Sequence, residues 1–163
     1  MLTVQDISNF LETFAPVTLA EEWDNVGLLV GDPDQEVKRL MTCLTITPAS
    51  AREAIERQAE MIITHHPLPF RPLKRLTTAQ TASRLLLQLI EGKIAVHSPH
   101  TAFDSAAAGI NQQLAEALKL ESIKPLIPQL DDAEGLGAGR RGKLAKPISL
   151  QAMAQRLRVF LDL

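Results

Sequence analysis

Cysteine is almost absent from this chain of 163 residues, because Cys43 is its one thiol. A disulfide framework and a thiolate zinc cluster are therefore excluded, and a reducing cytoplasm is the simplest setting. Long apolar runs are missing as well, and no stretch approaches the ~20 residues that a membrane-spanning helix needs. The amino terminus lacks the basic and apolar segments of a signal peptide. The sequence therefore predicts a cytoplasmic protein without a membrane segment.

An excess of one charge is also missing, since 17 basic and 19 acidic side chains leave a net charge of −2. The densest group of cations is at residues 139–143, which we interpret as a solvated turn. This balance gives little support to a nucleic-acid partner. What the chain does have is 45% hydrophobic and 22% charged residues, the composition of a globular protein with a substantial core.

Short apolar runs alternate with helical patterns over the first 118 residues. Apolar spacing and capping residues predict helices at 4–14, from Thr47 to 59, from 77 or 78 to 90, and at about 107–118. Short buried strands are expected at 27–31, 40–44, 61–63 and 94–96. This alternation predicts an α/β fold with a largely parallel sheet and helices on both of its faces.

The remainder of the chain has a different texture, with prolines followed by an acidic, glycine-rich run. We predict an α/β domain at 1–122, a linker or surface excursion at 123–138, and the start of a second α/β unit at 139–163. One strand and one helix cannot enclose a core. The second unit is therefore expected to be incomplete.

Two clusters of polar side chains follow strands of the predicted sheet. His65 and His66 come directly after the strand at 61–63, and His100 and Asp104 come after the strand at 94–96. In a parallel sheet, ligands gather beyond the carboxyl ends of the strands. Imidazole and carboxylate groups bind divalent ions such as zinc, iron or manganese. We therefore predict a metal site formed by His65, His66 and Asp104, in which two ions could share a bridging water.

Other interpretations of these residues stay open at the level of sequence. His100 either binds a metal or orients Asp104. Asp104 by itself fits the N-cap of the following helix, because aspartate is a preferred capping residue. A lone histidine is more often a polar residue near the surface than a ligand. Residues 22–25 (EWDN) either cap a turn or line the pocket.

Three segments in this order resemble the Nif-three-like family, whose members are also described as GTP cyclohydrolase I type 2 homologues or dinuclear metal centre proteins. They are residues 22–31 (EWDNVGLLVG), 62–70 (IITHHPLPF), and 100–104 (HTAFD) continuing to 109–115 (GINQQLA). The resemblance implies that His65, His66 and Asp104 are ligands in the amino-terminal half of a dinuclear site. It further implies two related α/β domains, a ring-shaped homo-oligomer and a cytoplasmic location.

The chain departs from the family pattern in its later part. Family members carry a carboxy-terminal histidine and glutamate that complete the metal site, and here no histidine follows His100. Thr45 stands where many relatives have an aspartate. The chain thus resembles the front part of a longer member, and turnover is not expected from it alone. Two functions remain: a metal-dependent hydrolase acting on a small nucleotide-like substrate, or a non-catalytic metal-binding or partner-binding scaffold.

Overall fold

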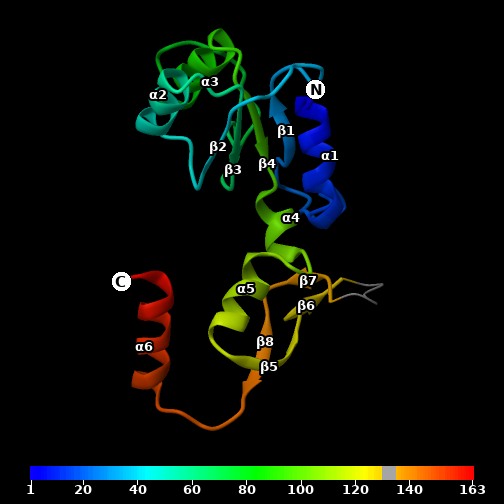
Figure 1. The fold of residues 1–163 in the computed structure, drawn as a ribbon, viewed down its shortest axis with the longest axis vertical. Helices are drawn as coiled ribbons and strands as arrows, with labels where there is room; N and C mark the ends of the chain where they lie inside the picture. Colours follow the sequence, from blue (N-terminus) through cyan, green and yellow to red (C-terminus); the bar gives the residue numbers. More distant parts are fainter. Residues whose placement is uncertain (130–134) are drawn as a thin grey trace. The chain divides into compact units, whose positions relative to one another are not determined.

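The computed structural model describes residues 1–129 and 135–163, which form two compact units, Met1–Ala102 and Phe103–Leu163. The organisation into residues 1–122, 123–138 and 139–163 stays a prediction, and residues 130–134 of its linker lie outside the described residues. The elements up to residue 105 are α1 (Val4–Phe14), the 3-10 helix η1 (Val17–Leu19), β1 (Gly27–Val30), β2 (Leu40–Cys43), α2 (Pro48–Glu56), β3 (Met61–Thr64), α3 (Thr81–Glu91), β4 (Ala95–Ser98) and α4 (His100–Ser105) (Figure 1).

The first unit is built on a four-stranded sheet with the strand order β1-β4-β3-β2. Strands β2, β3 and β4 run parallel, and β1 pairs antiparallel with β4 at one edge. The predicted α/β class and largely parallel sheet are confirmed. The sequence does not predict the antiparallel direction of β1, because a short apolar run fixes where a strand lies but not which way it runs.

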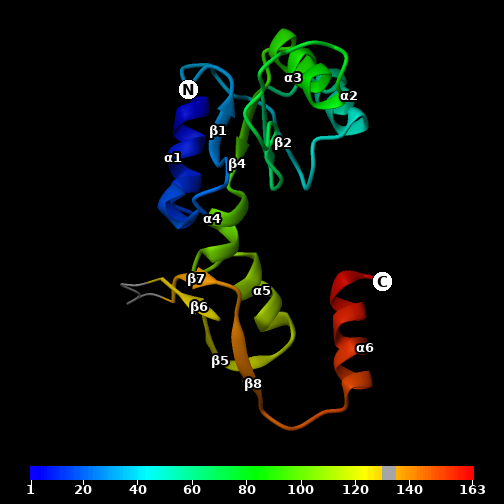
Figure 2. The same ribbon diagram turned by 180° about the vertical axis from the view of Figure 1, so that it is seen from behind.

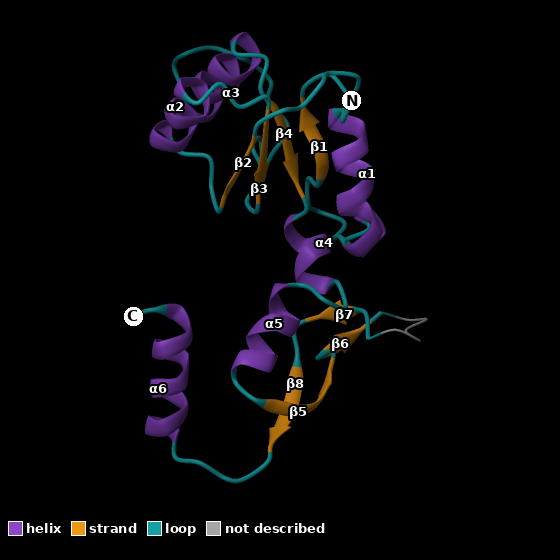
Figure 3. Ribbon diagram, in the orientation of Figure 1, coloured by secondary structure: helices purple, strands orange, loops and turns teal. Residues whose placement is uncertain are grey.

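Helices cover both faces of this sheet, as the sequence predicts. Successive side chains of a strand point to opposite faces, so neighbouring residues enter different cores. Met61 and Ala95 pack with α1, whereas Ile62 and Val96 pack in the core that includes α2 and α3. Figure 3 shows the sheet between α1 and the α2–α3 pair, and the view from behind in Figure 2 shows the same layering.

The predicted helix starts are accurate where a capping residue marks them. Thr3 and Asp6 form a capping box on α1, in which the Asp6 backbone N–H donates to Thr3 Oγ1 at 3.1 Å and the Thr3 N–H donates to Asp6 Oδ2 at 2.9 Å. Thr47 caps α2 in the same way through Ser50. Such caps contribute about 1 kcal/mol each to stability.

Two predicted helix starts are wrong. Helix α3 begins at Thr81 and not at residue 77 or 78, and its N-cap Gln80 provides no side-chain hydrogen bond. The helix predicted at about 107–118 is α5 (Ile110–Ala117), with Gly109 as its N-cap, and Asp104 lies within the separate short helix α4. Asp104 is therefore not the N-cap of the following helix.

The second unit contains two small antiparallel sheets, and the strands of one of them lie within residues 123–138, where the sequence predicts a linker or surface excursion. Its elements after α4 are α5, β5 (Leu120–Lys124), β6 (Ile127–Pro128), β7 (Gly137–Ala138), β8 (Arg141–Leu144) and α6 (Leu150–Leu161). Strands β5 and β8 form one sheet, and β6 and β7 form another. None of the twelve residues of α6 is buried. Among the described residues, no helix has both the length and the apolar character needed to cross a bilayer.

Arg140 stabilises the fold of the second unit, which corrects the interpretation of residues 139–143 as a solvated turn. Its guanidinium donates to the carbonyl oxygens of Ala106, Gly137 and Gly139, each at 2.7 Å, and to Gln112 Oε1 at 2.9 Å. The planar fork of five N–H donors suits this role. Arg141 and Lys143 are exposed, but they belong to strand β8 and not to a turn.

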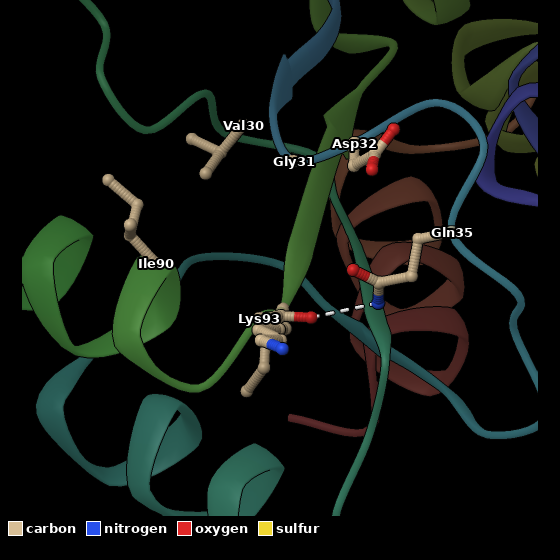
Figure 4. A pocket seen from close by; sticks show the side chains of 7 residues that line it. Val30, Gly31, Asp32, Gln35, Ile90 and Lys93 are labelled. Carbon is tan, nitrogen blue, oxygen red and sulfur yellow. Dashed lines mark hydrogen bonds between the residues drawn. The ribbon is translucent and has the colours of Figure 1, made fainter.

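Gly31 allows β1 to approach β4 closely. Its φ is +119°, and a Cβ built on it would lie 2.6 Å from Ala95 Cβ and 2.8 Å from Ala95 Cα. Both the backbone conformation and the lack of space therefore require glycine here. The same residue lines the pocket shown in Figure 4, beside Val30 and Asp32.

Replacing this glycine should destabilise the first unit. We expect Gly31→Ala to lower the free energy of unfolding by about 3 kcal/mol, because a methyl group would overlap Ala95 in a buried strand. Gly135→Ala is the matched control, since Gly135 also has a positive φ but no atom within 4 Å of the position that a methyl group would take; its loss should be about 1 kcal/mol. Urea unfolding measures both values, and equal losses would contradict the packing argument.

His97 should make the stability of the protein depend on pH. Its side chain is 1% exposed, with Nδ1 3.2 Å from Ser8 Oγ, and burial lowers the pKa of His97 to about 4. The unfolded histidine binds a proton near pH 6.5. Between these values the unfolded state binds more protons, so stability falls as pH is lowered through this window.

The loss attributable to His97 should reach about 2 kcal/mol at pH 5 relative to pH 7.5. Urea unfolding of the metal-free protein at the two pH values measures it. In His97→Asn the corresponding difference should shrink by this amount, because the amide does not titrate. An identical pH dependence in the parent protein and the variant would show that His97 is not the titrating group.

Candidate metal centre

The candidate site lies at the edge of the four-stranded sheet where the three parallel strands end. Thr45 follows β2, His65 and His66 follow β3, and His100 follows β4. Because β1 is antiparallel, the loop before it reaches the same edge and brings Asp24 there. The site is thus built from four loops of the first unit, at the position where parallel sheets usually bind ligands.

The loop that carries the two adjacent histidines is held by hydrogen bonds to its neighbours. The backbone N–H of His66 donates to the Leu44 carbonyl at 2.9 Å, and the Ser98 hydroxyl donates to the His65 carbonyl at 2.7 Å. The buried Thr64 hydroxyl lies 3.2 Å from the His66 carbonyl oxygen, to which it donates. These bonds fix the loop backbone between β2 and β4.

His65, His66 and His100 form a compact group of imidazoles. One nitrogen from each ring lies within 4.8 Å of the others. The ring centroids are 5.1 Å apart for His65 and His66, 5.1 Å for His65 and His100, and 5.8 Å for His66 and His100. His66 is exposed and the other two are half-buried, so the group is open to solvent on one side. Three imidazoles at this spacing are a donor set that suits zinc and neighbouring transition metals.

Asp24 holds His100 in place through a carboxylate that is itself removed from solvent. Its side chain is 0% exposed, against 16% for the imidazole. His100 Nδ1 lies 2.8 Å and 2.9 Å from the two carboxylate oxygens, and the Thr101 hydroxyl and backbone N–H donate to Oδ2. Burial raises the pKa of Asp24, but the hydrogen bonds from Thr101, His100 and the Asn25 backbone outweigh it and keep the pKa below its usual value.

These contacts determine which nitrogen of His100 can bind a metal. An ionised carboxylate only accepts hydrogen bonds, so Nδ1 of His100 must carry the proton that it donates to Asp24. In the neutral ring, the lone pair is then on Nε2. His66 has a comparable partner, since its Nδ1 lies 2.6 Å from Thr45 Oγ1. Partners of this kind orient metal-binding histidines and raise their basicity.

The structure brings two of the three predicted ligands, His65 and His66, together with His100. The sequence leaves His100 open between a ligand and an orienting residue, and its position in the imidazole group favours the first role. Asp104 lies in the second compact unit, and its role as a ligand stays a prediction. The carboxylate that contacts His100 is that of Asp24, whose sequence signal is the run at 22–25 shortly before a strand.

The cavity in Figure 4 is separate from the imidazole group. It has a volume of about 470 Å³ and lies near the other end of β1 and β4, where Val30, Ile90 and Lys93 line it. Gln35 Nε2 donates to the Lys93 carbonyl across it at 2.8 Å. Within the part of the chain that the structure describes, no histidine lines this cavity. The chemistry therefore points to the solvent-open edge with the imidazoles.

The sequence profile of one family, described as Duf34/NIF3 (NGG1p interacting factor 3), matches residues 2–163. NIF3-like protein 1 of Drosophila melanogaster is 38% identical over 152 residues, which are 91% of this chain and 52% of that protein. A protein of Clostridium acetobutylicum named GTP cyclohydrolase 1 type 2 homolog is 35% identical over 157 residues, which are 96% of this chain and 59% of the relative. The chain thus spans somewhat more than half the length of these curated relatives.

Solved structures with a similar fold also match this chain. Reduced HcgD from Methanocaldococcus jannaschii is 34% identical with a TM-score of 0.83, over 98% of this chain and 60% of that one. Staphylococcus aureus hypothetical protein SA1388 is 27% identical with a TM-score of 0.87, over 98% of this chain and 64% of that one. The resemblance stated from the sequence is therefore confirmed, and the chain belongs to the DUF34/NIF3 family.

Proposed function

We propose that this chain binds a divalent metal ion through His65, His66 and His100 and is part of a metal-dependent hydrolase acting on a small nucleotide-like molecule. The observation that carries the proposal is the group of three imidazoles with nitrogen atoms within 4.8 Å of one another. Asp104, the carboxylate predicted from sequence, is a further proposed ligand. Zinc, iron and manganese are the candidate metals.

The residues of the chain fit such an ion in protonation as well as in spacing. Asp24 keeps the Nδ1 proton of His100 in place and leaves Nε2 with its lone pair, and Thr45 contacts Nδ1 of His66. A divalent ion held there would supply Lewis acidity that polarises a substrate oxygen. The exposed side of the group leaves room for a substrate. The name of the Clostridium relative supports a nucleotide as the substrate class.

The assembly and location of the protein are part of the proposal. A ring-shaped homo-oligomer with a small-molecule partner, in the cytoplasm, is what the family resemblance suggests. The charge balance does not favour nucleic acid. Light scattering on the protein as it leaves a size-exclusion column would give its molar mass, and from this the number of chains in the oligomer.

Removing any imidazole of the group should weaken metal binding. We expect His65→Ala, His66→Ala and His100→Ala each to lower zinc affinity by more than about 100-fold. This loss is larger than the usual effect of removing a residue that only hydrogen-bonds to a metal ligand. Competition with a chromophoric chelator at pH 7.5 measures the affinity, and elemental analysis of purified protein measures the content. Chromatography measures how much GTP the protein consumes. Where a form of the protein consumes GTP, we expect the rate to depend on added metal.

The control for these variants is His97→Asn, which removes a histidine that contacts Ser8 and lies outside the group. Its zinc affinity should equal that of the parent protein. Metal content that is unchanged in all three alanine variants would overturn the metal centre. The same measurement on Asp104→Ala tests the carboxylate predicted from the sequence.

Asp24→Asn should weaken zinc binding although Asp24 is not expected to touch the ion. We expect a loss of about 10- to 100-fold, because the amide cannot hold the Nδ1 proton of His100 as the carboxylate does. Nitrogen-15 NMR of the imidazoles should show a shift toward the Nε2–H tautomer of His100. Asp32→Asn, which changes an exposed turn residue, is the matched control. Unchanged affinity together with an unchanged tautomer would contradict the role of Asp24.

A further inference from the structure

Beside the imidazole group lie two exposed aromatic side chains. Trp23 is 61% exposed and Phe70 is 42% exposed. Their ring centroids lie 6.5 Å and 6.2 Å from that of His100, and 6.0 Å from each other. All three pairs are edge-to-face, with interplanar angles of 70–90°. Together, Trp23 and Phe70 form what we call the aromatic wall of the site.

The aromatic wall is positioned by the same contacts that orient His100. Trp23 directly precedes Asp24, which is bonded to His100, and Asn25 Nδ2 donates to the Pro69 carbonyl at 2.7 Å, next to Phe70. A backbone hydrogen bond from the Asp24 N–H to the Glu21 carbonyl at 2.9 Å closes the turn before the strand. Both rings therefore sit on loops that are tied to each other and to the proposed ligand His100.

The arrangement suits a flat ring better than other ligands. Trp23 and Phe70 keep much of their surface exposed, and exposed aromatic faces bind planar bases by stacking. Trp23 makes no hydrogen bond within the described residues, so its indole N–H is available as a donor at the same place. A bound divalent ion next to the wall would repel a cationic ligand but not a neutral heteroaromatic ring.

We infer that Trp23 and Phe70 form a stacking subsite for the nucleobase of a nucleotide whose remaining part faces the imidazole group. This inference rests on the proposed function, because it names the part of the substrate that the chain recognises beside the metal. It assigns to the segment at 22–25 a binding role through Trp23 in addition to the orienting role of Asp24.

The chain is well suited to a direct test, because it contains one tryptophan and no tyrosine. Its intrinsic fluorescence therefore reports on Trp23 alone. We expect guanosine monophosphate to quench this fluorescence in the zinc-loaded protein with a saturable curve below about 1 mM, in the range of common Michaelis constants. Ribose 5-phosphate, which lacks the base, should not quench.

Variants separate stacking from other sources of affinity. By calorimetry, Trp23→Leu should bind guanosine monophosphate about tenfold more weakly, and Phe70→Leu should also bind it more weakly, while the zinc content of both stays at the parent level. Phe10→Leu is the matched control, because Phe10 is 66% exposed on α1 and does not take part in the aromatic wall. Its affinity for the nucleotide should be unchanged.

Failure of this inference is distinguishable from failure of the metal centre. Three results would overturn the stacking subsite if zinc binding is normal: no saturable quenching, equal quenching by ribose 5-phosphate, or parental nucleotide affinity in Trp23→Leu. Each of them would leave the metal centre intact. A fluorescence change that follows protein concentration but not nucleotide would also overturn it, and would indicate that a second copy of the chain covers the wall. Quenching by the nucleotide in protein that binds no zinc would support the stacking subsite and contradict the metal centre.

Discussion

The register of β3 between β2 and β4 is the constraint on which both the core and the candidate site depend. Thr64 is paired with Cys43, and Ile63 with His97, so the three parallel strands end at nearly the same level. A slip of one residue would exchange the side chains that face α1 with those that face α2 and α3. It would also displace His65 and His66 from the Leu44 and Ser98 contacts that hold them. Packing of the apolar side chains thus fixes the position of the polar ones.

The buried carboxylate of Asp24 is the second requirement, and it connects elements that are far apart in sequence. Removing an ionised group from water is costly unless hydrogen bonds replace its hydration. Here the donors are the His100 ring, the Thr101 hydroxyl and backbone, and the Asn25 backbone. The charge-assisted bonds attach the loop before β1 to the start of α4. A single side chain therefore closes one side of the site and sets the protonation of a proposed ligand.

The parts of the fold that could be predicted from sequence are those with a local signal. Capping residues such as Thr3, Thr47 and Ser149 mark helix starts, and each accepts the expected backbone hydrogen bond. The one strand predicted at 139–163 is β8, whereas β5, β6 and β7 were missed, because β5 is mostly exposed and the other two have only two residues each. Such strands lack the apolar alternation by which a strand is recognised.

In the candidate site, too, features with a local sequence signal could be predicted, and contacts between distant residues could not. His65 and His66 are adjacent in sequence and follow an apolar strand, so their pairing could be predicted. The contact between Asp24 and His100 joins residues 76 positions apart, and it exists only because β1 runs antiparallel to β4. No periodicity along the chain reports the direction of a strand, and for this reason the partner of His100 could not be found from sequence.

The sheet order leaves β2 as an edge strand opposite β1, which has a consequence for how the protein behaves at high concentration. An unpaired strand edge offers N–H and C=O groups to strands of other molecules and can start aggregation. β2 has only four residues and therefore offers few such groups, and Lys38 and Arg39 before it form ion pairs with Glu36 and Glu60. The short length of β2 thus helps to keep separate copies of the sheet from joining edge to edge.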